Sequence, residues 1–394
     1  MINIFNSSIS FNVEQGLIFV FVAFLVAMII SYLSHPIVIK VSNLKGLLPQ
    51  INNRSIHVNK TPSLGGIGIF LALNLTITFL GNYLGNYKLL IFLGSLTIMF
   101  FVGLVDDLIT ISAKSKIVFQ VIAASYFILI TNVKIEGLQG LFGIYEFPYF
   151  ISVIVTIIFF VVLINAYNLI DGVDGLAGCF AIVISLFFGS LFYLTRNYFM
   201  FVLSVILIGA IIPFLIYNFS KKNKIFMGDT GSMTIGFVLA YQAINFISTD
   251  ISEITMFANS KSLICFLALF SFPLIDTMRI FYIRLKAGVS PFKADKNHLH
   301  HVLLSKGFKH AEISLIVCAY TILMVLSTFV FKELAIIKQV VILGIIWLLT
   351  VTVIDNLKLD VLFKNLKSKS KVIDLPDTAN NKKDTIFNLN ELVS

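Results

Sequence analysis

Long apolar stretches separated by short polar connections make up most of this 394-residue chain. A helix needs about 20 predominantly apolar residues to cross the hydrocarbon core of a membrane. Eleven stretches qualify when the chain is read for the absence of Asp, Glu, Lys and Arg, with one exception that carries Asp276 and Arg279. The pattern predicts an all-α fold, that of a polytopic integral membrane protein with about eleven transmembrane helices. The stretches are centred near residues 17–33, 65–80, 89–105, 117–133, 149–166, 176–194, 199–217, 232–247, 262–283, 313–330 and 339–354.

Basic residues are concentrated in alternate connections, and the intervening connections are nearly bare of them. Because cytoplasmic loops carry an excess of Lys and Arg, this predicts an N-terminus outside and a C-terminus in the cytoplasm. The net charge of +9 then lies mostly on one membrane face, where it suits anionic lipid or phosphate ligands. The basic connections carry Lys40, Lys45, Arg54 and Lys60; Lys114 and Lys116; Lys221, Lys222 and Lys224; and Arg284, Lys286, Lys293, Lys296, Lys306 and Lys309.

The composition supports one membrane domain followed by a polar tail. The chain is 58% hydrophobic and 12% charged, whereas soluble domains carry about 25% charged residues. We expect a single transmembrane domain over residues 1–358, with its functional loops in the cytoplasm, and a loosely ordered cytoplasmic tail over 359–394. No soluble basic domain is present, so a nucleic-acid partner is not expected. Three cysteines, none in a CxxC motif, lie in apolar stretches and are assigned to core packing: Cys179, Cys265 and Cys318.

Polar clusters fall on the predicted cytoplasmic side of the membrane domain, although most contain neither Lys nor Arg. Asp106 and Asp107 end the third stretch, and being about 100° apart on a helix they should have separate roles. The run from Asn165 to Asp174 ends the fifth stretch, with amides or carboxylates at every third position. We predict a helix carrying Asn165 and Asn168, then a glycine-assisted turn that brings Asp171 and Asp174 back toward a common site. The remaining clusters are Arg54 with His57, residues 228–232, and residues 298–301.

The chemistry of these clusters favours a cation and a phosphate-bearing ligand. Asp229 and Asn168 offer the hard oxygen ligands that suit Mg²⁺, which uses few protein ligands together with substrate phosphates. Asp229 also fits a helix-capping pattern. The cluster His298-Leu299-His300-His301 favours phosphate binding, with a zinc site and an ordinary wet loop as alternatives. Asp276 and Arg279, three residues apart, are either a structural ion pair or part of the site.

Together these motifs resemble the polyprenyl-phosphate N-acetylhexosamine-1-phosphate transferase family. The branch is similar to the enzymes that start O-antigen, enterobacterial common antigen and teichoic acid synthesis, because the histidine cluster differs from that of the peptidoglycan branch. The matching pieces, in family order, are Arg54…His57…Pro62…Gly65-Gly66, Gly103–Asp107, Asn165–Leu176, Gly228–Ser232, and Pro291-Phe292…Asp295…His298–His301.

The resemblance implies a reaction and a distribution of roles. An undecaprenyl phosphate would attack the β-phosphorus of a UDP-N-acetylhexosamine, most commonly UDP-GlcNAc, and UMP would leave. This would make the lipid-linked first sugar of a cell-envelope polysaccharide at the cytoplasmic face of a bacterial inner membrane. The resemblance also admits a homodimer. The implied residues are Asp106, Asp107, Asp171 and Asp174 for catalysis; Arg54, His57, Asn165, His298, His300 and His301 for substrate binding; and Asn168 and Asp229 for Mg²⁺, with Mn²⁺ as an alternative.

The sequence leaves two mechanistic points and one competing function open. Asp106 is either a base or a group that only orients the lipid phosphate. A phosphate monoester has a second pKa near 6, so it is mostly dianionic at neutral pH, and we expect direct attack without a covalent aspartyl intermediate. The alternative function is a cation-coupled membrane transporter, which predicts acidic residues near the middle of the spans. The sequence leaves open which hexosamine is used, the prenyl length and the glycan that is built.

Overall fold

The computed structural model describes residues 13–47, 61–84, 88–251, 261–290 and 297–356, and this part of the chain is almost entirely helical. The described residues up to Asn356 form one compact unit. The predicted tail, residues 359–394, lies outside the described residues. The α-helices are α1 (Val13–Lys45), α2 (Gly65–Leu84), α3 (Lys88–Ile109), α4 (Ala113–Thr131), α5 (Tyr149–Leu169), α6 (Leu176–Leu194), α7 (Tyr198–Asn218), α8 (Gly228–Ile247), α9 (Ser262–Leu269), α10 (Ser271–Lys286), α11 (Leu299–Ser305), α12 (His310–Val330) and α13 (Ile336–Asn356).

Each apolar stretch of the sequence forms a helix or, in one case, a pair of helices. Among the described residues, eight helices are long and apolar enough to cross a membrane, or up to nine if α9 and α10 form one span. These two helices are bent by 65° relative to each other. The apolar part of α2, Gly65–Leu80, is shorter than the others. The prediction of an all-helical polytopic membrane protein is confirmed, while the count of about eleven spans and the orientation of the termini stay predictions.

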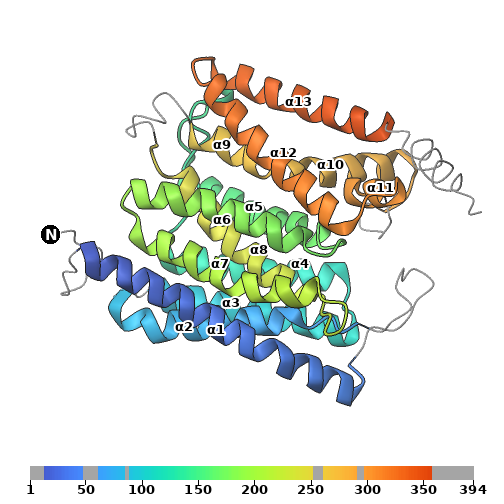
Figure 1. Ribbon diagram of the computed structural model, residues 1–394. Coiled ribbons are helices and arrows are strands. Elements are labelled where there is room, and N and C mark those ends of the chain that lie inside the picture. Colours follow the sequence, from blue (N-terminus) through green and yellow to red (C-terminus); the bar gives the residue numbers. More distant parts are fainter. Residues whose placement is uncertain (1–12, 48–60, 85–87, 252–260, 291–296, 357–394) are drawn as a thin grey trace, which may run out of the picture. The chain divides into compact units, whose positions relative to one another are not determined.

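Helix α8 lies in the middle of the compact unit, and the other long helices run roughly alongside it (Figure 1). It contacts α2, α3, α5, α6 and α9, and nearly all of its residues after the first turn are buried. By contrast, α13 and α1 keep many large apolar side chains exposed. Exposed apolar surface on this scale suits contact with lipid chains. The central position of α8 makes its first turn the natural meeting point for residues from its neighbours.

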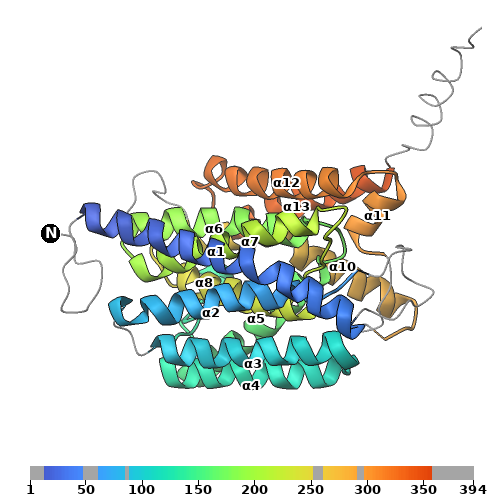
Figure 2. The same cartoon turned by 60° about the horizontal axis from the view of Figure 1, so that its bottom comes forward.

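Helices α3 and α4 pack against each other on one side of the unit, and α12 and α13 lie on the opposite side (Figure 2). The short connection between α3 and α4 is capped at both ends. Asp106 accepts a hydrogen bond from the Ile111 amide at 2.8 Å, and the Ser112 side chain accepts one from the Ser115 amide at the start of α4. The end of α3 and the start of α4 are therefore held together beside the first turn of α8.

Candidate functional site

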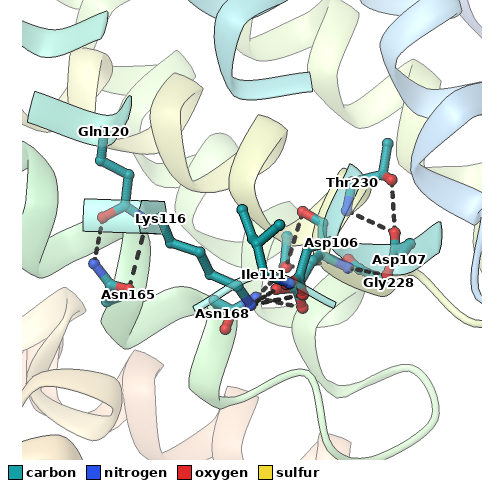
Figure 3. Close-up of polar contacts among 11 residues, drawn as sticks. Asp106, Asp107, Ile111, Lys116, Gln120, Asn165, Asn168, Gly228 and Thr230 are labelled. Atoms are coloured by element: carbon teal, nitrogen blue, oxygen red, sulfur yellow. Dashed lines mark hydrogen bonds and ion pairs between the residues drawn. The ribbon is translucent and has the colours of Figure 1, made fainter. Parts of the chain in front are cut away.

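The centre of the site is an ammonium group between two carboxylates. Lys116, in the first turn of α4, lies 2.6 Å from Asp106 Oδ2 at the end of α3. The same Nζ atom also pairs with Asp229 Oδ2 in the first turn of α8. Figure 3 shows the Lys116 side chain reaching from α4 toward this acidic group. Three helices therefore converge on one partly buried cluster of charges, where attraction between opposite charges is stronger than in bulk water.

Asp107, the neighbour of Asp106, has a different role and caps the start of α8. Its Oδ1 accepts a hydrogen bond from the Asp229 amide at 2.9 Å. Its Oδ2 accepts two from Thr230, from the amide at 2.9 Å and from the hydroxyl at 2.6 Å. The first amides of a helix have no partner within the helix, and a carboxylate near them is favourable. Through these three hydrogen bonds, Asp107 holds the backbone at the start of α8 in place and thereby positions Asp229 (Figure 3).

Two glycines allow this close approach. Gly228 has a φ of +70°, and a Cβ there would lie 1.9 Å from the Ser63 carbonyl oxygen. A Cβ at Gly103, one turn before Asp107 on α3, would lie 2.5 Å from the Asp229 carbonyl oxygen. Only glycine fits such positions without moving the backbone. The backbones of α3 and α8 can therefore touch directly, so that short aspartate side chains reach between them.

The two asparagines of α5, Asn165 and Asn168, lie about one helical turn apart and have different hydrogen-bond partners. Asn168 Nδ2 donates to Asp229 Oδ1 at 3.1 Å and to Ser232 Oγ at 2.6 Å. These donations orient the amide and leave its oxygen as the group available to a cation. Asn165, one turn deeper, donates to Gln120 Oε1 at 2.6 Å and to the Val161 carbonyl at 2.7 Å. Asn165 and the buried Gln120 therefore join α5 to α4 beside the charged cluster (Figure 3).

The predicted turn after α5 is present and places two carboxylates in contrasting surroundings. Among the described residues, no hydrogen-bond donor reaches the Asp171 carboxylate. Burial, followed by the negative charges of Asp229 and Asp107, raises the pKa of Asp171 well above its ordinary value. Asp171 is thus a further acidic group near Asp106 and Asp229, whose cationic partner in the described part of the chain is Lys116.

Asp174 is instead well compensated. Its Oδ2 lies 2.6 Å from Lys224 Nζ and 3.0 Å from His310 Nδ1. Burial opposes ionisation of Asp174, but its contacts with His310 and Lys224 outweigh it and hold the pKa below its ordinary value. Asp174 consequently links the turn after α5 to the loop before α8 and to the start of α12.

The histidine cluster lies against the turn that carries Asp171. The His298 and His300 rings are stacked 5.7 Å apart, and the His300 and His301 centroids are 4.3 Å apart. A Cβ on Gly172 would lie 2.5 Å from His300 Nε2, so this ring is in contact with the turn. His300 is fully buried with no hydrogen-bond partner for either ring nitrogen in the described part of the chain. Burial, followed by His301 and His298, holds the pKa of His300 well below its ordinary value. Arg54 and His57 lie outside the described residues.

The donor set of the site fits a magnesium ion better than a transition metal. Within the described ranges, no group of three or more His, Cys, Asp or Glu side chains is arranged to hold a metal ion. Mg²⁺ needs no such cage, because it is bound through one or two carboxylates together with water and substrate phosphates. Asp229 and Asn168 supply oxygens of this kind, while in this structure the two Asp229 oxygens are bound by Lys116 and by the Asn168 amide nitrogen. A zinc site at residues 298–301 has no support from the described geometry.

Sequence reasoning missed several residues that complete the site. From the sequence, Lys116 contributed only to the predicted membrane orientation, because a lysine in a short connection does not indicate which side chains lie near it in the fold. Gln120 lies in an apolar stretch, and its spacing of four from Lys116 would have placed both on one face of α4. The other residues that only the fold connects to the predicted clusters are Lys224 and His310. Asp276, already a candidate from the sequence, pairs with both Arg279 and His298.

Comparison with known proteins shows which family part of the chain resembles. The sequence profile of the family described as glycosyl transferase family 4 matches residues 89–247. This range includes Asp106 and Ser232 and ends before the histidine cluster. This part of the chain is therefore similar to glycosyl transferase family 4.

The relatives extend the likeness beyond that range. An undecaprenyl-phosphate alpha-N-acetylglucosaminyl 1-phosphate transferase of Yersinia pestis is 27% identical over 329 residues, covering 82% of this chain and 86% of the relative. The protein of the same name from Salmonella typhi is 28% identical over 289 residues, covering 72% and 75%. A decaprenyl-phosphate N-acetylglucosaminephosphotransferase of Mycobacterium tuberculosis is 29% identical over 322 residues, covering 74% and 78%. These relatives share most of their length with the chain.

Proposed function

We propose that this protein is a member of glycosyl transferase family 4, and that it transfers N-acetylglucosamine-1-phosphate from UDP-N-acetylglucosamine to undecaprenyl phosphate and releases UMP. The observation that carries the proposal is the Asp106–Lys116–Asp229 cluster, with Asn168 and Asp171 beside it, at the ends of membrane helices. The names of the relatives supply the acceptor and the sugar. They give no support to the transporter alternative. The site would face the cytoplasm of a bacterial inner membrane, where the basic connections attract the nucleotide sugar.

In this mechanism the protein positions two phosphates and neutralises charge. Phosphoryl transfer depends mostly on positioning and electrostatic stabilisation. A phosphate oxygen of the lipid attacks the β-phosphorus of the donor, and the bond from that phosphorus to the bridging oxygen breaks as UMP departs with it. Lys116 would contact the reacting phosphates, and Asp106 would orient the lipid phosphate. No proton needs to be removed from a dianionic phosphate, so direct attack requires no covalent aspartyl intermediate.

A divalent cation completes the charge balance of this site. Asp229 and the Asn168 oxygen would hold Mg²⁺, and Asp171 would lie near it. Mg²⁺ supplies neutralisation of the diphosphate oxygens of the donor when bound. Asp107 keeps the Asp229 backbone in place, while the Gln120–Asn165 pair closes the site toward the membrane interior.

The first experiment measures UMP release by purified protein with undecaprenyl phosphate, Mg²⁺ and, separately, UDP-GlcNAc, UDP-GalNAc and UDP-MurNAc-pentapeptide. We expect release that depends on lipid and Mg²⁺ with UDP-GlcNAc. Asp229→Asn should abolish it, whereas Glu136→Gln, an exposed acid-to-amide change, should leave it intact. Absence of release from folded protein with every donor would overturn the proposal.

The metal assignment has a separate readout. Mg²⁺ should raise the unfolding temperature of the wild-type protein in detergent, because a ligand that binds only the folded state stabilises it. The increase should be much smaller in Asp229→Asn. An equal increase in both proteins would remove Asp229 as a metal ligand, whatever the activity assay shows.

A further inference from the structure

A buried carboxylate in α10 holds the start of the histidine cluster. The Asp276 side chain is only 1% exposed. It lies 2.8 Å from His298 Nδ1, and its two oxygens lie 3.2 and 3.3 Å from the Leu299 amide. Neither the residues assigned to the transfer reaction nor the pattern of motifs includes Asp276. A buried carboxylate is costly unless it is paired and hydrogen-bonded, so these contacts account for how Asp276 is tolerated.

Arg279, one turn later on α10, also binds the segment that contains His298. Its guanidinium lies 3.5 Å from Asp276 Oδ1 and donates to the Asn297 carbonyl at 2.9 Å. The residues before and after His298 are therefore both bound to α10, one through its carbonyl and the other through its amide. Asp276 and Arg279 form an ion pair, as the sequence allowed, and this pair also fixes the backbone around His298.

The contact at Nδ1 determines which way the His298 ring faces. When one ring nitrogen of a histidine donates to a carboxylate, the tautomer and the ring orientation are fixed, and the other nitrogen becomes the one presented to a ligand. The His298 ring lies parallel to the His300 ring, with an angle of 13° between their planes. The His300 ring in turn contacts Gly172, next to Asp171. Asp276 thus sets the orientation of a row of rings that ends at the acidic turn.

We propose that Asp276 is a positioning residue for the transfer reaction, which orients His298 so that its Nε2 atom contacts the diphosphate of the nucleotide-sugar donor. The proposal rests on the proposed function for its substrate, but the Asp276–His298 bond can be tested independently of it. Asp276 itself touches no substrate and acts through His298.

Steady-state kinetics of a double-mutant cycle test the functional coupling. Asp276→Asn keeps the size of the side chain and removes one of its two acceptor oxygens. Carboxylates that orient ligand-binding histidines are typically worth about 10–100-fold in affinity or activity. We expect Asp276→Asn to raise the KM for the UDP-sugar by a factor in that range and to leave the KM for undecaprenyl phosphate unchanged.

The decisive comparison is the same substitution in a His298→Ala background. Residues that act as a unit are non-additive, so we expect Asp276→Asn to cause little further loss there. Thr277→Val is the matched control, because Thr277 lies beside Asp276 but donates only within α10, to the Pro273 carbonyl. Losses that multiply in the double variant, or equal increases in both KM values, would reduce Asp276 to a structural residue and overturn the proposal.

Nitrogen NMR of ¹⁵N-histidine-labelled protein gives a readout that requires neither turnover nor a folded Asp276 variant. His298→Gln identifies the His298 signals by their disappearance. In the wild-type protein, Nδ1 of His298 should carry the proton and be hydrogen-bonded. A His298 ring protonated only at Nε2 would overturn the proposal, while absence of UMP release would overturn only the proposed function.

Discussion

At the scale of single residues, neighbouring aspartates have different structural roles. Asp106 pairs with Lys116, whereas Asp107 accepts three hydrogen bonds from the start of α8. Their separation around the helix foretold separate roles, but only the position of α8 revealed that one of them is a cap. The same contrast holds between Asp171, which lacks a counter-ion in the described structure, and Asp174, which pairs with Lys224 and His310.

Substitution of Lys116 tests the charge at the centre of the site. Lys116→Ala should lower kcat roughly 10²–10³-fold, a loss typical of removing one preorganised group that stabilises charge in the transition state. Lys114→Ala is the matched control, because Lys114 lies two residues away in the same helix but is exposed. UMP release with saturating substrates measures both. Comparable activity of the two variants would contradict a role for Lys116 in catalysis.

The Asp174–Lys224 pair predicts a dependence of stability on pH. Because the pKa of Asp174 is lower in the folded protein than in the unfolded chain, its contribution is fully present above the unfolded value of about 3.9 and is lost as the pH falls through the folded value. Lys224→Met removes one cause of the lowering. The variant should lose about 1–3 kcal/mol at neutral pH, and less as the pH falls, because protonation of Asp174 in the variant removes the charge that Lys224 no longer compensates.

Thermal unfolding between pH 3 and pH 7 measures this difference. Lys222→Met provides the control, since Lys222 lies in the same loop and is exposed. A destabilisation by Lys224→Met that stays constant across the whole pH range would show that the lysine stabilises the protein by packing and not by its charge.

At the scale of elements, the site depends on how closely α3 approaches α8. Gly103→Ala would place a methyl group 2.5 Å from the Asp229 carbonyl oxygen, and overpacking of this kind costs about 1–3 kcal/mol. We expect a lower unfolding temperature together with a loss of UMP release, because the helices must separate. At Gly94 on the same helix, a Cβ would meet only the Tyr126 ring at 3.3 Å. Gly94→Ala should therefore retain most activity, and equal effects at both positions would contradict this explanation.

The positions of the helices were the most predictable property at this scale. A segment that crosses a membrane must satisfy its own backbone hydrogen bonds, so a long apolar stretch has to form a helix. The turn after Asn168 was also foreseen, from the three-residue spacing and the glycines that follow it. The break at Phe270 between α9 and α10 was not, because the apolar pattern continues across it without interruption. Pairings such as Gln120 with Asn165 also escaped prediction, because they depend on which helices become neighbours.

At the scale of the whole molecule, the orientation in the membrane is testable by labelling. Single cysteines at Glu136, between α4 and α5, and at Lys222, between α7 and α8, should react from opposite sides in intact cells, with the three native cysteines replaced by alanine. An impermeant maleimide should label Glu136→Cys directly and Lys222→Cys only after permeabilisation. The reverse pattern would invert the predicted topology and move the site to the outer face.

The sequence by itself determined the helical membrane fold and the clustering of carboxylates, amides and histidines at helix ends, because hydropathy and local spacing are properties of neighbouring residues. Only the tertiary structure decided which groups meet. It brought Lys116 between Asp106 and Asp229, turned Asp107 into a cap, and buried Asp276 against His298. Apart from the Asp106–Lys116 pair, these contacts join residues from 22 to 123 positions apart, and their formation depends on close helix packing that no local pattern encodes.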